Sequence, residues 1–241
     1  MPRIAGKNLS LAPNIGYEMF RFAKPSLNMT KKGLPALLLF PNFPIMEFVD
    51  EMLVKVNSIG GLSDDELLKF CVENDHMRVE RDANGNLIFM SPTYSNTGKQ
   101  NARIVQAFAN WNDKYDKGEC FDSSSGFILP DKAMRSPDFS FILHENLKKL
   151  KPSQKKGFYK ICPDFVLELR SETDLQETLR VKMREYIRNG ASLGWLIDPI
   201  DKVVVIYDKN GSVTEFKDFR KPLKGKYFLG DFEIVLQKIL S

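Results

Sequence analysis

The amino-acid sequence predicts an α/β protein with a mixed central β-sheet flanked by helices. Segments whose apolar residues recur every three or four positions alternate along the chain with short apolar runs that are typical of strands. The run at residues 163–169 is almost continuously apolar, which indicates a buried strand. An Asn-Gly pair between two other short runs indicates an antiparallel hairpin. The order helix, hairpin, helix, strands, helix and strands therefore favours a mixed sheet.

The first regular element is expected within residues 61–74, as a helix. Ser63 is placed to cap its N-terminus, and Glu66, three positions further on, completes a capping box. A hairpin follows, in which Asn84 and Gly85 form the turn between two short runs with alternating apolar residues. The ordered part of the chain is therefore expected to begin with a capped helix and a two-stranded antiparallel ribbon.

Residues 97–118 follow a helical period and predict the next helix, which Gly118 is expected to end. The apolar face of this helix consists of Ile104, Phe108, Trp111 and Tyr115. Residues 124–143 then predict two short strands around a Pro-Asp turn. A lysine-rich connection over residues 148–160 leads from these strands to the buried strand at residues 163–169.

A further helix is expected over residues 174–190, with Asp174 at its cap and Gly190 at its end. Its apolar side consists of Leu175, Leu179, Met183 and Ile187. Residues 193–208 predict two strands joined by a turn, and a last segment at residues 227–240 closes the chain. The helix thus connects two strand regions, as in an α/β arrangement.

The domain organisation and the compartment follow from composition. Residues 1–45 mix proline, lysine and apolar residues without a sustained period, so we expect an N-terminal arm followed by a single domain at residues 46–241. The apolar run near the start is too short to cross a bilayer and contains prolines, so no membrane contact is expected. Cys71, Cys120 and Cys162 form no Cys-x-x-Cys pair, which favours a reducing, cytoplasmic setting.

Two acidic residues stand out because they lie at or inside expected strands. Asp138 begins one strand, and Glu168 lies inside the apolar strand 30 residues later. If these strands are neighbours, both carboxylates can converge on one edge of the sheet, where hard oxygen ligands suit Mg²⁺ or Mn²⁺. Such a metal polarises a phosphoryl oxygen and lowers the pKa of bound water. The alternative is structural, with each acid capping a turn or pairing with Arg135 or Arg170.

Several ordered motifs resemble those of the Uma-type putative restriction endonuclease family, which belongs to the PD-(D/E)XK nuclease-like superfamily. These motifs are "RSPDFSFI", "CPDFVLELRSETD" and "KMREYIRNGASLGWLIDP", preceded by "RVERDANGNLIFMSPTYSNTGKQNARI". The resemblance covers about residues 55–241. It implies a restriction-endonuclease-like core and a site that cleaves phosphodiester bonds in DNA with Mg²⁺ or Mn²⁺.

The resemblance also assigns roles to individual acids. Asp138 matches the aspartate of the family motif, and Glu168 matches the acid of its second half, so both are implied metal ligands and catalytic residues. Glu80, on the expected hairpin, matches a further acid of the Uma-type pattern and is a third candidate ligand. The alternative for Glu80 is an exposed hairpin acid beside Arg78 and Arg81.

The basic member of the motif departs from the superfamily pattern. Arg170 stands where a lysine is expected two residues after the acid. An arginine can steady a phosphate or the attacking water, but it stays charged and cannot act as a base near neutral pH. Lys182 lies four residues before Tyr186 on the following helix, so the two share a face. This pair resembles the arrangement of relatives that take their lysine from that helix, although a solvated helix carries lysines in any case.

The expected partner is DNA. The net charge of +4 tolerates a nucleic acid without demanding one. Lys155 and Lys156, together with Tyr186, are candidate contacts to it, and the alternative for the lysines is a solvated loop. A homodimer is expected because cutting both strands of a duplex commonly needs two sites. Arg170 keeps a second function open, in which the fold has lost its chemistry and serves as a nucleic-acid-binding or scaffolding module.

Overall fold

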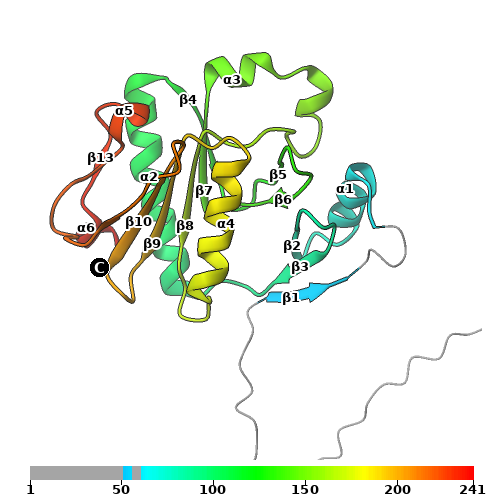
Figure 1. The fold of residues 1–241 in the computed structure, drawn as a ribbon, viewed down its shortest axis with the longest axis horizontal. Coiled ribbons are helices and arrows are strands. Elements are labelled where there is room, and N and C mark those ends of the chain that lie inside the picture. Colours follow the sequence, from blue (N-terminus) through cyan, green and yellow to red (C-terminus); the bar gives the residue numbers. More distant parts are fainter. Residues whose placement is uncertain (1–50, 56–60) are drawn as a thin grey trace, which may run out of the picture. The chain divides into compact units, whose positions relative to one another are not determined.

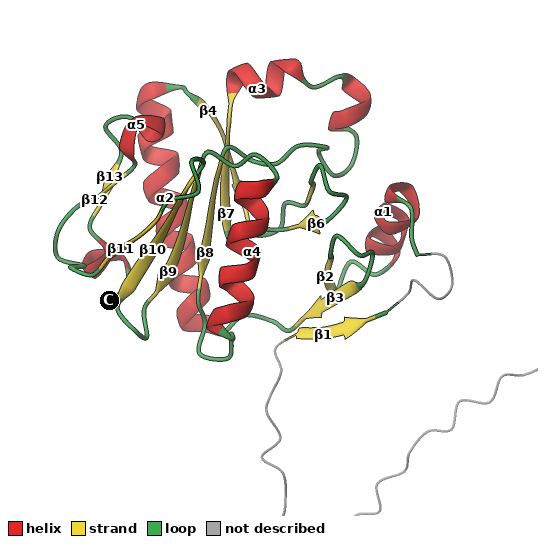
Figure 2. Cartoon of the chain, viewed as in Figure 1, coloured by secondary structure: helices red, strands yellow, loops and turns green. Residues whose placement is uncertain are grey.

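Residues 51–55 and 61–241 are described by the computed structural model, and the arm expected at residues 1–45 lies outside them. Strands form a large and a small sheet, and helices cover their faces (Figures 1 and 2). The helical segments are α1 (Asp64–Glu73), α2 (Ser95–Tyr115), α3 (His144–Lys149), the 3-10 segment η2 (Pro152–Lys155), α4 (Gln176–Arg188), α5 (Lys226–Leu229) and α6 (Leu236–Ile239). Among the described residues, no helix combines the length and the apolar character that a membrane crossing requires.

The large sheet has the strand order β11-β10-β9-β8-β7-β4. Its strands are β4 (Gly118–Asp122), β7 (Phe139–Leu143), β8 (Phe165–Leu169), β9 (Leu193–Asp198), β10 (Val203–Asp208) and β11 (Val213–Phe216). Strands β8 and β9 pair in parallel, joined by the crossover helix α4, whereas the other neighbours pair antiparallel. The predicted mixed sheet is therefore confirmed.

Helices cover both faces of this sheet. On one face, Phe108 of α2 stacks on Phe139 and packs against Phe165 in the main core. On the other face, Met183 of α4 belongs to a second core with Val166. Figure 1 shows α4 in front of the strands and α2 behind them. This two-sided cover explains why the strand β8 has buried residues at every position.

The small sheet has the strand order β1-β3-β2-β6-β5, and α1 packs on it. Its strands are β1 (Glu51–Val54), β2 (Arg78–Arg81), β3 (Leu87–Met90), β5 (Phe127–Ile128) and β6 (Met134–Arg135). The predicted hairpin is the antiparallel pair β2–β3, in which Gly85 has a positive φ of 85°. The predicted capping box of Ser63 and Glu66 is also present. A short ribbon of β12 (Leu223–Lys224) and β13 (Glu233–Ile234) completes the strands.

Two predicted helix ends were wrong. Helix α2 ends at Tyr115 because Asp116 adopts the left-handed conformation, with φ at 45°. Gly118 instead opens β4, where an added Cβ would lie 2.1 Å from the carbonyl oxygen of Ile142. At α4 the N-cap residue is Leu175, and the carboxylate of Asp174 accepts a hydrogen bond from the backbone N–H of Ser171 at 2.6 Å. Gly190 does follow the end of α4, with φ at 109°.

Candidate active site

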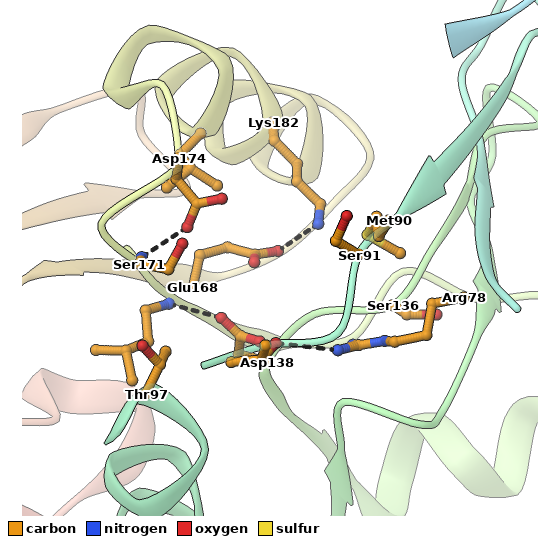
Figure 3. Close-up of a pocket in the computed structure, with 13 residues that line it drawn as sticks. Arg78, Met90, Ser91, Thr97, Ser136, Asp138, Glu168, Ser171, Asp174 and Lys182 are labelled. Atoms are coloured by element: carbon orange, nitrogen blue, oxygen red, sulfur yellow. Dashed lines mark hydrogen bonds and ion pairs between the residues drawn. The ribbon is translucent and has the colours of Figure 1, made fainter. Parts of the chain in front are cut away.

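A small pocket of about 70 Å³ lies where β7 begins and β8 ends (Figure 3). It is bounded by both sheets, by the beginning of α2 and by α4. The residues that line it are Arg78, Met90, Ser91, Thr93, Thr97, Ser136, Asp138, Glu168, Leu169, Ser171, Asp174, Leu179 and Lys182. Polar side chains from separate elements therefore converge on one cavity, as they do in binding and catalytic sites.

The two carboxylates singled out in the sequence both line this pocket. Strands β7 and β8 are antiparallel neighbours, with Phe139 opposite Leu167. Asp138 precedes Phe139 and Glu168 follows Leu167, so the two acids are carried to facing positions, where side chains of an antiparallel pair lie on the same side of a sheet. The backbone N–H of Leu169 donates a hydrogen bond of 2.8 Å to Oδ2 of Asp138 and fixes that carboxylate.

Helix α4 supplies two donors to Glu168. The Nζ atom of Lys182 lies 3.0 Å from Oε1 of Glu168, and the hydroxyl of Tyr186 donates to the same oxygen at 3.0 Å. These two residues are one helical turn apart and therefore reach the strand from one face of the helix. Lys182 and Tyr186 therefore do share one face of the helix, as their spacing in the sequence predicted, and that face contacts Glu168.

Glu80 lies behind Lys182 and not in the pocket wall. It accepts from Nζ of Lys182 at 2.9 Å, from the guanidinium of Arg135 at 3.0 Å and from the backbone N–H of Ser136 at 2.8 Å. Arg135 in turn contacts Glu185 at 2.6 Å. Both carboxylate oxygens of Glu80 are engaged by protein donors, so this placement argues against the metal-ligand role expected from the sequence and against an exposed hairpin acid.

The buried cluster and the pocket wall together contain more acidic than basic side chains. The carboxylates of Glu80 and Glu185 offset the cations of Arg135 and Lys182, whose side chains they contact directly. Arg78 and Asp174 add one charge of each sign to the pocket wall. Of the described side chains that touch the pocket or this cluster, the carboxyl groups of Asp138 and Glu168 remain without a matching cation. A bound cation of charge +2 would balance them when both are ionised.

The pKa values follow from this arrangement. Burial, with the added repulsion of Asp138 and Glu80, raises the pKa of Glu168 to about 8 despite the attraction of Lys182. Burial likewise raises the pKa of Asp138. Burial alone would lower the pKa of Lys182, but Glu168 and Glu80 outweigh it and raise that pKa. Lys182 is therefore an ammonium at neutral pH and a poor base.

The carboxylates of Asp138 and Glu168 fit Mg²⁺ or Mn²⁺, which keep part of their water shell. They do not fit a metal ion whose ligands all come from protein side chains. In the part of the chain that the structure describes, no group of three or more His, Cys, Asp or Glu side chains is clustered to hold a metal ion. Magnesium is usually held by one or two carboxylates and keeps several water molecules. Asp138 and Glu168 supply two carboxylates, and the pocket has room for a small ion with some of its water.

Arg170, Tyr186 and the two lysines do not lie where the sequence analysis expected them to act. Arg170 follows the end of β8 and contacts Asp198 at 2.7 Å, outside the pocket. Tyr186 is fully buried, so it cannot contact a nucleic acid. Lys155 and Lys156 are exposed at and after η2 and do not line the pocket. Arg135 and Arg170 were also the expected structural partners of the two acids, but both bind other carboxylates.

The place of Arg78 in the pocket wall was not predicted from the sequence. Its guanidinium donates to the carbonyl of Ser123 at 3.1 Å and to the hydroxyl of Thr93 at 3.4 Å, across the pocket from Lys182 (Figure 3). A signal was present, because Arg78 and Glu80 are two residues apart on one strand and so point to the same face. Recognising Glu80 as a site residue implied that Arg78 faces the site as well.

Comparison with known proteins gives one family and one fold. A family model described as "Putative restriction endonuclease", Uma2, matches residues 64–236, which is more than half of the chain. None of the curated proteins matches. A solved structure of a putative nuclease belonging to DUF820 from Anabaena variabilis is similar, with a TM-score of 0.63 and 16% identity, over 74% of this chain and 97% of that chain. At this identity the likeness shows the fold, and it confirms the predicted restriction-endonuclease-like core.

Proposed function

We propose that this chain, which belongs to the Uma2 family of putative restriction endonucleases, is a DNA endonuclease. It would hydrolyse phosphodiester bonds with the help of a divalent metal ion. The observation that carries the proposal is the pair of surplus carboxylates, Asp138 and Glu168, which line one pocket beside the ammonium of Lys182. A phosphodiester and a hard cation are the ligands that this combination of charges suits.

Asp138 and Glu168 are the residues that would hold Mg²⁺ or Mn²⁺. When bound there, such an ion supplies Lewis acidity toward a phosphoryl oxygen and lowers the pKa of a bound water. The protein's own contribution is to hold the two carboxylates in place. The backbone N–H of Leu169 fixes Asp138, and the donors of Lys182 and Tyr186 fix Glu168.

Lys182 and Arg78 supply the positive charge that phosphoryl transfer requires. Lys182 is held as a cation at the pocket, so it stabilises negative charge that develops on the phosphate and does not remove a proton. Arg78 presents a planar guanidinium, which can bind two phosphate oxygens at once. Arg78 comes from the small sheet and Lys182 from α4, so a phosphate in the pocket would be contacted from two sides.

The alternative function is a nuclease fold that binds nucleic acid or a partner without cleaving. It was motivated by Arg170 in the place of a lysine. Lys182 favours hydrolysis over this alternative. Its ammonium lies beside Glu168, in the place where a lysine at position 170 was expected to act, whereas Arg170 contacts Asp198 instead. The alternative nevertheless predicts a distinct result, namely DNA binding without cleavage.

Nicking of supercoiled plasmid tests the two functions. The wild type should nick in Mg²⁺ or Mn²⁺ and stop in EDTA, whereas Asp138→Asn and Glu168→Gln should each lose about 100-fold or more in rate. Both variants should also bind Mn²⁺ more weakly by calorimetry. Asp218→Asn removes a half-buried carboxylate that does not line this pocket and serves as the control. Metal affinity that is unchanged in both pocket variants would refute the ligand assignment, and binding without cleavage would select the alternative.

We also propose that the active form on duplex DNA is a homodimer, because two-fold symmetry places two equivalent sites on two antiparallel strands. Analytical ultracentrifugation with and without a duplex checks this. A species that remains a monomer at micromolar concentration on DNA, while it still makes double-strand breaks, would contradict the dimer.

A further inference from the structure

We propose that Glu80 and Arg135 are positioning residues for Lys182, and that through them the small sheet completes the active site on the large sheet. The inference rests on the proposed function, because the orientation of Lys182 matters to catalysis only if the pocket binds a phosphodiester. It concerns residues that do not line the pocket and therefore act through Lys182.

The geometry is a continuous row of buried charges of alternating sign. Glu185 contacts Arg135 at 2.6 Å, Arg135 contacts Glu80 at 3.0 Å, and Glu80 contacts Lys182 at 2.9 Å. Lys182 then contacts Glu168 at 3.0 Å at the pocket. All five side chains are at most 10% exposed. Low exposure strengthens each of these attractions, because little solvent screens them.

Lys182 needs two anchors because its side chain is long and flexible. A lysine carries several rotatable bonds and a compact charge, so one partner does not define its orientation. Glu168 holds the ammonium at the pocket, and Glu80 holds it from behind. The anchor from Glu80 does not compete with a ligand, because Glu80 lies outside the pocket wall.

Glu80 is itself fixed by the segment that carries Asp138. The backbone N–H of Ser136 donates to Oε1 of Glu80, and Arg135 donates to its Oε2. Arg135 ends β6 of the small sheet, and Asp138 directly precedes β7 of the large sheet. The short connection between β6 and β7 therefore determines the positions of both Asp138 and Glu80.

The neighbouring residue on β2 offers a matched comparison. Arg81 is buried and forms an ion pair of 2.6 Å with Asp64, and it also donates to the carbonyls of Leu62 and Lys132. Arg81 lies on the same strand as Glu80, whereas Asp64 begins α1, which packs on the small sheet, and neither residue lines the pocket. Asp64→Asn therefore weakens the ion pairs of Asp64 with Arg81 and Lys160 without a change at Lys182.

The kinetic test compares Glu80→Gln, Asp64→Asn, Lys182→Met and the double variant Glu80→Gln/Lys182→Met in plasmid nicking. Glu80→Gln should lower kcat about tenfold or more, with KM and Mn²⁺ affinity within about threefold of the wild type. In the Lys182→Met background, Glu80→Gln should cost no further activity, because the positioned group is gone. Asp64→Asn should lower Tm and leave kcat unchanged. Glu80→Asp, which keeps the charge but shortens its reach, replaces Glu80→Gln if the latter does not fold.

A measurement independent of cleavage separates this inference from the proposed function. In protein labelled with [¹⁵N]lysine, the ammonium of Lys182, assigned by its loss in Lys182→Met, should give a slowly exchanging NMR signal in the wild type. The signal should broaden or vanish in Glu80→Gln and persist in Asp64→Asn. An unchanged signal in Glu80→Gln, or a kcat loss that adds fully to that of Lys182→Met, overturns the positioning role. A wild type without nuclease activity overturns the proposed function, while the NMR result still decides the positioning.

Discussion

The ammonium of Lys182, on a helix, lies 3.0 Å from a carboxylate oxygen of Glu168, in the middle of a buried strand. An ionised acid is costly to place inside an apolar strand, and one lysine shared with a second carboxylate does not remove that cost. The pKa of Glu168 accordingly stays raised, at about 8. The ionised form of Glu168 therefore lowers the stability of the metal-free protein, and the first two predictions below follow from this relationship.

Replacing Glu168 by glutamine should make the metal-free protein more stable at alkaline pH. The folded-state pKa of Glu168 is raised to about 8 from an ordinary value of 4.5. A raised pKa contributes stability that is fully present below the unfolded-state pKa and is lost as pH rises through the folded-state value. The Tm of the wild type in EDTA should therefore fall between about pH 4.5 and 8 and level off above that, and the Tm of Glu168→Gln should fall less. Scanning fluorimetry across this range measures both, and parallel curves would contradict the assignment.

Metal binding should release protons and strengthen with pH. Because burial keeps Glu168 largely protonated at neutral pH, with a pKa of about 8, a proton competes with the cation for that carboxylate. Mn²⁺ affinity should rise as pH increases toward 8 and level off above it. Calorimetry in two buffers of different ionisation enthalpy counts the released protons. Glu168→Gln should abolish most of this release, whereas Asp218→Asn should leave it intact.

Arg78→Ala should weaken DNA binding more than metal binding. Arg78 lines the pocket and contacts a hydroxyl and a backbone carbonyl, so its guanidinium is available for a phosphate. We expect KM to rise about tenfold and the slope of log affinity against log salt to decrease by about one. Mn²⁺ affinity should stay within about twofold, because Arg78 holds neither ligand directly. Arg184→Ala, an exposed arginine paired with Glu177, is the control and should change none of these quantities.

Arg170→Met should leave cleavage nearly unchanged and lower stability. Arg170 contacts Asp198 at 2.7 Å, and Asp198 is fully buried, so loss of the guanidinium removes one partner of a buried carboxylate. The cost should be about 1–3 kcal/mol in the free energy of unfolding. kcat should stay within about threefold of the wild type because Arg170 lies outside the pocket. A kcat loss comparable with that of Lys182→Met would restore the catalytic role expected from the sequence.

The sequence predicted those parts of the fold that depend on local pattern. The capped helix α1, the hairpin at Gly85 and the buried strand β8 follow from cap residues, turn residues and apolar runs. Strand β4 was missed, because its five residues, Gly118–Asp122, include two acids and no alternating apolar pattern. It is an edge strand of the large sheet, where partial exposure tolerates such a composition.

The site was predictable where neighbouring strands carry it and where helical spacing places Lys182 and Tyr186 on one face. Asp138 and Glu168 meet because two adjacent strands present them at facing positions, which the motif pattern indicated. The role of Glu80 depends on how the small sheet packs beside α4, and no spacing in the sequence specifies that packing. The misplacement of Arg170 has a local cause, since β8 ends at Leu169 and the next side chain turns toward Asp198.

The row of charges from Glu80 to Lys182 also has a consequence for biosynthesis. Glu80 and Lys182 are 102 positions apart in the chain, so a nascent polypeptide that stops short of α4 contains Glu80 but lacks the ammonium of Lys182 and the carboxylate of Glu185. A truncated product that begins after the hairpin keeps Asp138 and Glu168 but loses Glu80. The complete row of charges therefore forms only when the two sheets and α4 have come together.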